Sequence, residues 1–233
     1  MKVGIMQPYF LPYIGYFQLI NAVDKFVIYD NIEYTKKGWI NRNRILINGK
    51  SEYITLPLKK DSDFLYVNQR FLSDTFDNEK NKILRKIKEN YRNSPNFDIG
   101  YCLCEKIFNY KSNNLFEYIF NSLQIICNYL NIKTELILSS TINIDHNLKS
   151  EEKVLSICAF LKADIYINSI GGMSIYNLKN FEDSNLKLEF INSQFISYQQ
   201  RQNLFIPWLS ILDVIMFNPL ETIRDYLLKT KTL

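Results

Sequence analysis

The fold class is decided by residues 2–30, which read KVGIMQPYFLPYIGYFQLINAVDKFVIYD. The stretch begins with a short apolar segment, Lys2 to Met6, and continues into a loop that contains two prolines. From Tyr13 to Val23 the apolar residues recur at helical spacing, and Lys25 to Tyr29 is again apolar and rich in strand-forming residues. Strand, loop, helix and strand in so short a stretch form the βαβ pattern, which is typical of a parallel sheet.

The last third of the chain returns to the same alternation. Further strands are predicted at Thr134–Leu138, Asp164–Asn168 and Leu186–Ile191, and helices at Ser150–Lys162 and Trp208–Phe217. We therefore predict an α/β fold with a mostly parallel open sheet that is flanked by helices.

The middle of the chain carries a hairpin and a helical region. Asn48-Gly49 lies between the strand candidates Trp39–Ile47 and Glu52–Leu56, which predicts a tight β-hairpin. With the extended stretch Phe64–Phe71, this hairpin is expected to form a flap on the main sheet. Residues of about 74–132 show helical periodicity, so we predict that residues 1–233 form one α/β domain with a helical insertion or sub-domain there.

Composition excludes several classes of function. The net charge is +4 at pH 7, too small for the dense cationic surface of a nucleic-acid-binding protein, so we expect no nucleic-acid partner. His146 is the only histidine, which excludes a site built from several histidine ligands, and we predict no metal site. It lies in a polar loop that we expect to be exposed and without function, so a Ser-His-Asp triad is also unexpected.

The sequence also predicts where the protein resides. The longest apolar stretch, Ile206 to Phe217, is too short to span a bilayer and contains Asp213, so we expect no membrane insertion. The first residues do not form the apolar region of a signal peptide. The four cysteines are expected to be reduced and buried, and the chain to be cytoplasmic. The oligomeric state stays open.

Three segments follow predicted strands and are candidates for one shared pocket, because open α/β sheets bind ligands beyond the carboxyl ends of their strands. They are Gln7–Phe17, Asp30–Arg44 and Ser169–Tyr176. In the first, Gln7 is held by a proline where a strand stops. The aromatic side chains that follow, among them Tyr9 and Tyr16, form either a stacking wall for a base or a sugar, or part of the core.

The segment around Arg42 and Arg44 is the densest in polar groups. Along an extended strand these arginines share one face, where they can hold a diphosphate or a carboxylate, and Trp39, Asn41 and Asn43 share the other. Lys37 adds a further cation nearby. The alternative is an exposed edge strand that is protected by charge.

Two later motifs have both a chemical and a structural interpretation. Gly171-Gly172 follows a strand, so its backbone N–H groups can face an anion, although paired glycines are also common in ordinary turns. Asp213 interrupts an apolar helix, and it is either hydrogen-bonded for structure or catalytic.

Several of these blocks resemble the WbqC-like protein family. The resemblance rests on Met6–Phe17, on Tyr29-Asp30 continuing to Ile45, on Ser169–Tyr176, on Tyr198-Gln199 and on Pro207–Asp213, in family order over nearly the whole chain. Two positions depart from the pattern, Glu33 and Lys153. The resemblance implies a role in the biosynthesis of bacterial O-antigen, the lipopolysaccharide surface chain, or of another surface polysaccharide.

The resemblance and the residues together predict a transferase that modifies a nucleotide-linked amino sugar, in the first instance a dTDP-linked one, by N-acyl or aminoacyl transfer to the sugar amine. Asp30 and Asp213 are the candidate catalytic residues, which would orient or deprotonate the amine. The acyl donor is unknown, and no cofactor is assigned. The candidate substrate-binding residues are Gln7, Tyr9, Tyr16, Lys37, Trp39, Asn41, Arg42, Asn43, Arg44, Ser169, Gly171, Gly172, Tyr176, Tyr198 and Gln199.

Three other functions remain open at this point. One is a glycosyltransferase of the same pathway. Another is an ATP-using ligase, because the strand, Pro12-Tyr13-Ile14-Gly15-Tyr16 and helix are similar to the nucleotidyltransferase and class I synthetase superfamily, in which histidines flank the Ile-Gly pair. The third is a non-catalytic binding or scaffold protein.

Overall fold

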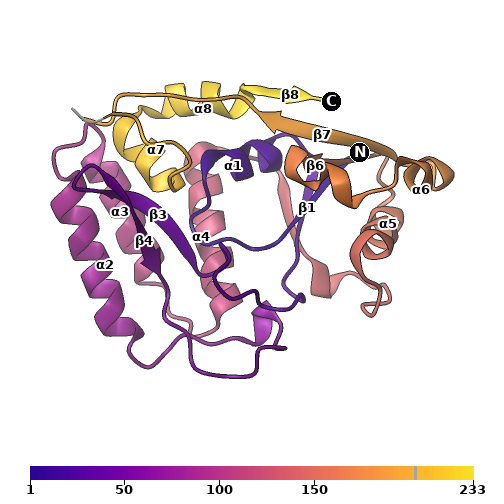
Figure 1. The fold of residues 1–233 in the computed structure, drawn as a ribbon, viewed down its shortest axis with the longest axis horizontal. Coiled ribbons are helices and arrows are strands. Elements are labelled where there is room, and N and C mark those ends of the chain that lie inside the picture. The colour runs from indigo at the N-terminus through magenta and orange to yellow at the C-terminus, as the bar shows by residue number, and fades with distance from the viewer. Residues whose placement is uncertain (202–203) are drawn as a thin grey trace.

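The computed structural model describes residues 1–201 and 204–233, and a six-stranded sheet runs through its centre (Figure 1). The strand order is β5-β2-β1-β6-β7-β8. All neighbours pair in parallel except β7 and β8, which pair antiparallel. The predicted mostly parallel α/β sheet is therefore confirmed. The strands are β1 Lys2–Met6, β2 Lys25–Ile28, β5 Glu135–Leu138, β6 Ile165–Ser169, β7 Lys187–Ser193 and β8 Thr230–Thr232.

Eight α-helices surround this sheet and the hairpin within the described residues. They are α1 Ile14–Asn21, α2 Phe76–Tyr91, α3 Phe97–Phe108, α4 Leu115–Leu130, α5 Ser150–Leu161, α6 Leu178–Asp183, α7 Ile211–Phe217 and α8 Leu220–Leu228. Figure 1 places α2 and α3 at one end of the molecule and α5 and α6 at the other. No helix in the described part of the chain is long and apolar enough to cross a membrane.

The two faces of the sheet pack against different helices because successive side chains of a strand point to opposite sides. In β2, Phe26 belongs to the larger core cluster with α1, α4, α7 and α8, whereas Val27 belongs to the smaller cluster with α5 and α6. In β6, Ile167 and Tyr166 divide in the same way. The sheet is thus buried on both faces, as near-continuous apolar strands require.

The predicted hairpin forms its own two-stranded sheet, from β3 Arg42–Ile47 and β4 Lys50–Thr55. Residues 39–41 do not belong to β3, so the predicted strand begins three residues too early. The stretch predicted as extended, Phe64–Phe71, contains a 3₁₀ helix at Val67–Gln69 and contributes only isolated bridges. A single turn of helix satisfies its backbone locally, which a partnerless strand cannot do.

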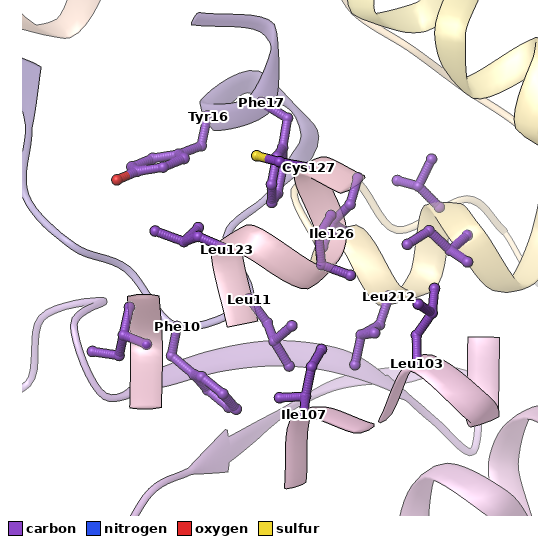
Figure 2. Close-up of a cluster of buried hydrophobic side chains, with 14 of the residues drawn as sticks. Phe10, Leu11, Tyr16, Phe17, Leu103, Ile107, Leu123, Ile126, Cys127 and Leu212 are labelled. Carbon is purple, nitrogen blue, oxygen red and sulfur yellow. The ribbon is translucent and has the colours of Figure 1, made fainter. Parts of the chain in front are cut away.

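The loop after β1 is held rigidly because its middle is part of the core. Phe10 and Leu11 are completely buried and point toward side chains of α3, α4 and α7 (Figure 2). The Phe10 N–H donates to the Ile40 carbonyl at 3.0 Å, and the Ser210 hydroxyl donates to the Leu11 carbonyl at 2.8 Å. These contacts tie the loop to the segment before β3 and to the residue that caps the start of α7.

The cysteines follow the prediction except for one. Three of them, Cys104, Cys127 and Cys158, are buried, whereas Cys102 is exposed on α3, and all four are free thiols.

Candidate functional site

The strand order places a topological switch point between β1 and β6. The chain leaves β1 through α1 on one face of the sheet and leaves β6 through α6 on the other, as the two core clusters show. Ligands of open α/β sheets bind in the crevice that such a divergence leaves beyond the carboxyl ends of the strands. Gln7 follows β1 and Ser169 ends β6, so both lie at this crevice. Asp30 lies beside them, just after β2.

Asp30 is a buried carboxylate, 2% exposed, and it is tied to two neighbouring segments. Its Oδ1 accepts hydrogen bonds from the Ser139 hydroxyl at 3.1 Å and from the Ser140 N–H at 2.9 Å. Its Oδ2 accepts one from Asn68 Nδ2 at 3.0 Å. These donors fix the orientation of the carboxylate at the end of β2.

Lys153 and His146 complete this group, and neither is among the residues predicted for the site. Lys153 is 6% exposed, and its Nζ lies 3.4 Å from Asn31 Oδ1 and 5.4 Å from the centre of the Tyr29 ring. The exposed His146 shares a hydrogen bond of 3.0 Å with Asn31 Nδ2. We call Asp30, Asn31, Ser139, His146 and Lys153 the sheet-edge cluster.

Two effects shift the pKa of Lys153 in opposite directions. Burial lowers its pKa from the ordinary 10.5, and the nearby carboxylate of Asp30 offsets part of this change. A lysine with a lowered pKa is a better candidate for proton transfer near neutral pH than an exposed one. In the sequence, Lys153 stands out only because it departs from the family pattern. That departure does not reveal which residues surround it.

The third predicted segment lies on the other side of the crevice. Ser169 is half-buried, and the Tyr176 hydroxyl lies 3.1 Å from both the Tyr166 hydroxyl and Asn168 Nδ2. A Cβ at Gly172 would lie 2.6 Å from Asn168 Nδ2, so a larger residue there would displace this side chain and its contact with the Tyr176 hydroxyl. Gly171 is exposed and has open space around it, and the turn itself is a 3₁₀ helix.

The first two predicted segments meet in a pocket of about 160 Å³. We call it the arginine–aromatic pocket, and its lining residues are Tyr9, Pro12, Tyr13, Trp39, Asn43, Arg44 and Trp208. Sequence reasoning missed Trp208, which meets Tyr13 edge to face with ring centres 5.9 Å apart. The segment Ser169–Tyr176 does not line this pocket.

The two arginines of β3 are stacked on aromatic rings. The Arg42 guanidinium lies 4.4 Å from the centre of the Tyr53 ring, and that of Arg44 lies 5.3 Å from the Trp39 ring. Trp39 therefore contacts the arginine face of the hairpin, not the opposite face that strict alternation predicts. The reason is that Trp39 precedes the strand, so the two-residue period does not apply to it.

The two arginines differ in how their N–H groups are used. Arg42 donates from Nε to the Gly38 carbonyl at 3.0 Å and from Nη2 to the Lys37 carbonyl, while the Lys37 side chain is exposed. Arg44 donates to the Trp208 carbonyl at 3.3 Å, and its buried Nε has no partner among the described residues. Arg44 is therefore the better placed of the two to bind an anion in the pocket.

Four predicted binding residues hold the loops together. Asn41 donates to the Leu56 carbonyl at 2.8 Å, and Asn43 donates to the Phe10 carbonyl at 3.1 Å. The Tyr16 hydroxyl donates to the Gln7 carbonyl at 2.9 Å, and Tyr16 is 2% exposed. Of the aromatic wall, Tyr9 lines the pocket and Tyr16 supports it from the core side, with ring centres 5.6 Å apart.

Asp213 lies completely buried in α7, inside a closed polar group. Its oxygens accept hydrogen bonds from the Tyr91 hydroxyl at 2.8 Å, the Tyr198 hydroxyl at 2.6 Å and Gln200 Nε2 at 2.7 Å. Burial raises the pKa of Asp213, and these hydrogen bonds act against the rise. Gln199 is exposed and donates to the Arg201 carbonyl at 3.2 Å. A catalytic role of Asp213 stays a prediction.

No group of three or more His, Cys, Asp or Glu side chains that suits a metal ion occurs within residues 1–201 and 204–233.

Fold and site define a mostly parallel α/β protein with a polar cluster at the carboxyl edge of its sheet and a separate arginine–aromatic pocket. The chain belongs to the WbqC-like protein family, whose model matches residues 7–225. It is 31% identical over 230 residues to "Uncharacterized protein Rv1507c" of Mycobacterium tuberculosis, and the match covers 97% of each chain. No solved structure matches the chain.

Proposed function

We propose that this protein is a transferase that modifies a nucleotide-linked amino sugar, such as a dTDP-linked one, by acyl or aminoacyl transfer to the sugar amine. The proposed context is the biosynthesis of O-antigen or another bacterial surface polysaccharide. The observation that carries the proposal is the arginine–aromatic pocket. There the buried Nε of Arg44 has no partner among the described residues, and the lining has four aromatic rings, those of Tyr9, Tyr13, Trp39 and Trp208.

The chemistry of this pocket suits a nucleotide. A guanidinium binds phosphate oxygens through several N–H groups, and aromatic side chains stack on a base or a sugar. The volume of about 160 Å³ suits one ring of a ligand whose remainder lies outside. Gln7, at the end of β1, is two residues from Tyr9, and an extended chain of that length spans about 7 Å. A nucleotide sugar bound at Tyr9 therefore reaches the crevice at the sheet edge.

The sheet-edge cluster would handle the proton of the acyl transfer. The amine nitrogen forms a bond to the acyl carbon, the leaving group of the donor departs with its electron pair, and the nitrogen loses one proton. Lys153, with its lowered pKa, is the proposed proton acceptor, and Asp30 is a positioning residue that orients the group. Asp213 is the less favoured candidate for this step, because its two oxygens already accept three hydrogen bonds.

The ATP-using ligase is less well supported by the geometry. In the similar strand–loop–helix of class I synthetases, histidines flank the Ile-Gly pair, whereas tyrosines stand at both places here. Here Tyr16 is buried and its hydroxyl donates to the Gln7 carbonyl, so it offers nothing to ATP.

Titration calorimetry with a dTDP-linked amino sugar and with dTDP tests the proposal. Arg44→Ala should weaken binding of both about tenfold or more, because a charge-assisted contact is worth about 1.5–3 kcal/mol. Arg92→Ala is the matched control, since Arg92 is exposed at the end of α2, and it should leave the affinity unchanged.

A second measurement tests the reaction itself. Incubation with the amino sugar and candidate acyl donors, followed by mass spectrometry, should show a product heavier by one acyl or aminoacyl group. Lys153→Met should abolish that product and leave the calorimetric affinity nearly unchanged. The proposal is wrong if neither the sugar nor dTDP binds, or if Arg44→Ala binds both as the wild type does.

A further inference from the structure

A second cavity, separate from the arginine–aromatic pocket, opens beside the segment between β4 and the 3₁₀ helix at residues 67–69. Its volume is about 660 Å³, within the range of pockets that hold small-molecule ligands. Its lining residues are Tyr34, Lys36, Asn41, Thr55, Leu56, Pro57, Leu58, Lys59, Lys60, Asp61, Ser62, Asp63 and Arg70. None of the cationic residues among them belongs to the predicted site.

Arg70 is the unusual member of this lining. It is 5% exposed, yet no carboxylate in the described part of the chain lies within ion-pair distance of it. It donates from Nη1 to the Ser62 carbonyl at 2.7 Å and from Nη2 to the Lys59 carbonyl at 3.5 Å, and it lies 4.9 Å from the Tyr34 ring. Its Nε has no partner among the described residues.

A buried guanidinium without a counter-charge is unfavourable, because carbonyl oxygens and a ring replace only part of its hydration. An arginine does not lose its proton to escape this cost. No carboxylate of the described residues forms an ion pair with Arg70, although Asp61 and Asp63 line the same cavity, so an anion from solution can balance its charge.

The remaining charges of the cavity favour the same class of ligand. Lys36 and Lys59 form ion pairs with Asp63 at 2.7 Å and Asp74 at 2.9 Å, respectively. Lys60 has no ion-pair partner in the part of the chain that the structure describes. The lining thus has four cationic and two anionic side chains, among which Arg70 is buried and Lys60 is exposed.

We propose that this cavity binds a phosphorylated small molecule, with Arg70 and Lys60 contacting its phosphate. The site is independent of the proposed nucleotide-sugar function, since it shares no lining residue with the arginine–aromatic pocket. Arginine suits this role because its planar N–H groups match the geometry of phosphate oxygens.

Thermal unfolding of the full chain tests the inference, with inorganic phosphate, pyrophosphate or ATP added against sodium chloride of equal ionic strength. An anion at ten times its Kd should raise the Tm by about 3 °C. Arg70→Met, which keeps the length of the side chain, should remove the rise, and Lys60→Ala should weaken the apparent affinity about threefold. A tighter site for ATP than for phosphate indicates a nucleotide, and equal affinities indicate a simple phosphoryl group.

Two controls separate this site from the proposed sugar site. Arg85→Ala, at an exposed position on α2, should keep the full rise, and so should Arg44→Ala when inorganic phosphate is the added anion. The inference is overturned if the wild type shows no rise beyond that in chloride. It is equally overturned if Arg44→Ala removes the rise seen with inorganic phosphate, or if Lys60→Ala and a folded Arg70→Met both keep it. Because Lys60 is exposed, its variant gives a result even if Arg70→Met does not fold.

Discussion

Two aspartates of this protein are buried to nearly the same degree, but their surroundings differ. Asp213 is completely buried, and two tyrosine hydroxyls and a glutamine amide close around it. Asp30 is 2% exposed, but it lies at the carboxyl edge of the sheet, beside Lys153 and close to the exposed His146. The comparison teaches that burial of a carboxylate does not identify a reactive site. What matters is whether its neighbours are reachable from solvent.

The largest expected effect is the loss of stability in Asp213→Ala. Three buried donors lose their acceptor, so the free energy of unfolding should fall by about 4 kcal/mol. Urea unfolding followed by circular dichroism measures this change. A loss below about 1 kcal/mol would show that the donors find other acceptors and that the group is not closed.

Asp30→Ala should cost less, about 2 kcal/mol. Ser140, one of its donors, is exposed, so water can replace the lost acceptor there. The same urea measurement applies, and Asp213→Ala is the matched comparison. If Asp30→Ala lowered the free energy of unfolding more than Asp213→Ala, then access of water to the donors would not explain the difference between the two aspartates.

Tyr198→Phe should lower the free energy of unfolding by about 1 kcal/mol, because one oxygen of Asp213 loses a hydroxyl donor and keeps the Gln200 amide. Tyr129→Phe is a suitable control at a half-buried position on α4. Equal stability of Tyr198→Phe and wild type would indicate that the 2.6 Å contact contributes nothing in solution.

The smallest expected effect is on the titration of Lys153. Its folded pKa is lowered by burial, so the unfolded chain binds more protons between that pKa and 10.5. The contribution of this residue to stability therefore rises with pH across that window, and the difference between wild type and Lys153→Met should follow the same course. Urea unfolding from pH 7 to 10.5 measures both proteins.

Asp30→Asn tests the interaction between Asp30 and Lys153 directly. The carboxylate of Asp30 raises the pKa of Lys153, so its removal should lower that pKa further. NMR titration of isotope-labelled lysine side chains measures the shift, with the exposed Lys162 as the reference. An unchanged or higher pKa in the variant would show that the two groups do not interact.

Sequence reasoning succeeded where the pattern is local. The βαβ pattern of residues 2–30 predicted β1, α1 and β2, and Asn48-Gly49 predicted the turn of the hairpin. Sequence reasoning failed at the residues where a strand begins to pair with its neighbour. Trp39 was placed on the wrong face because nothing in the sequence marks the start of β3 at Arg42.

In the candidate site, too, some features follow from local sequence and others only from the tertiary structure. The sequence by itself determined the class of fold and the strand-end loops that carry polar and aromatic groups, because strand periodicity and proline-bounded loops are encoded by neighbouring residues. Only the tertiary structure decided that Lys153 and His146 stand beside Asp30, that Trp208 closes the arginine–aromatic pocket, and that Arg70 is buried without a carboxylate. These contacts join residues far apart in the chain, and they form only when helices and strands pack together, which no local pattern records.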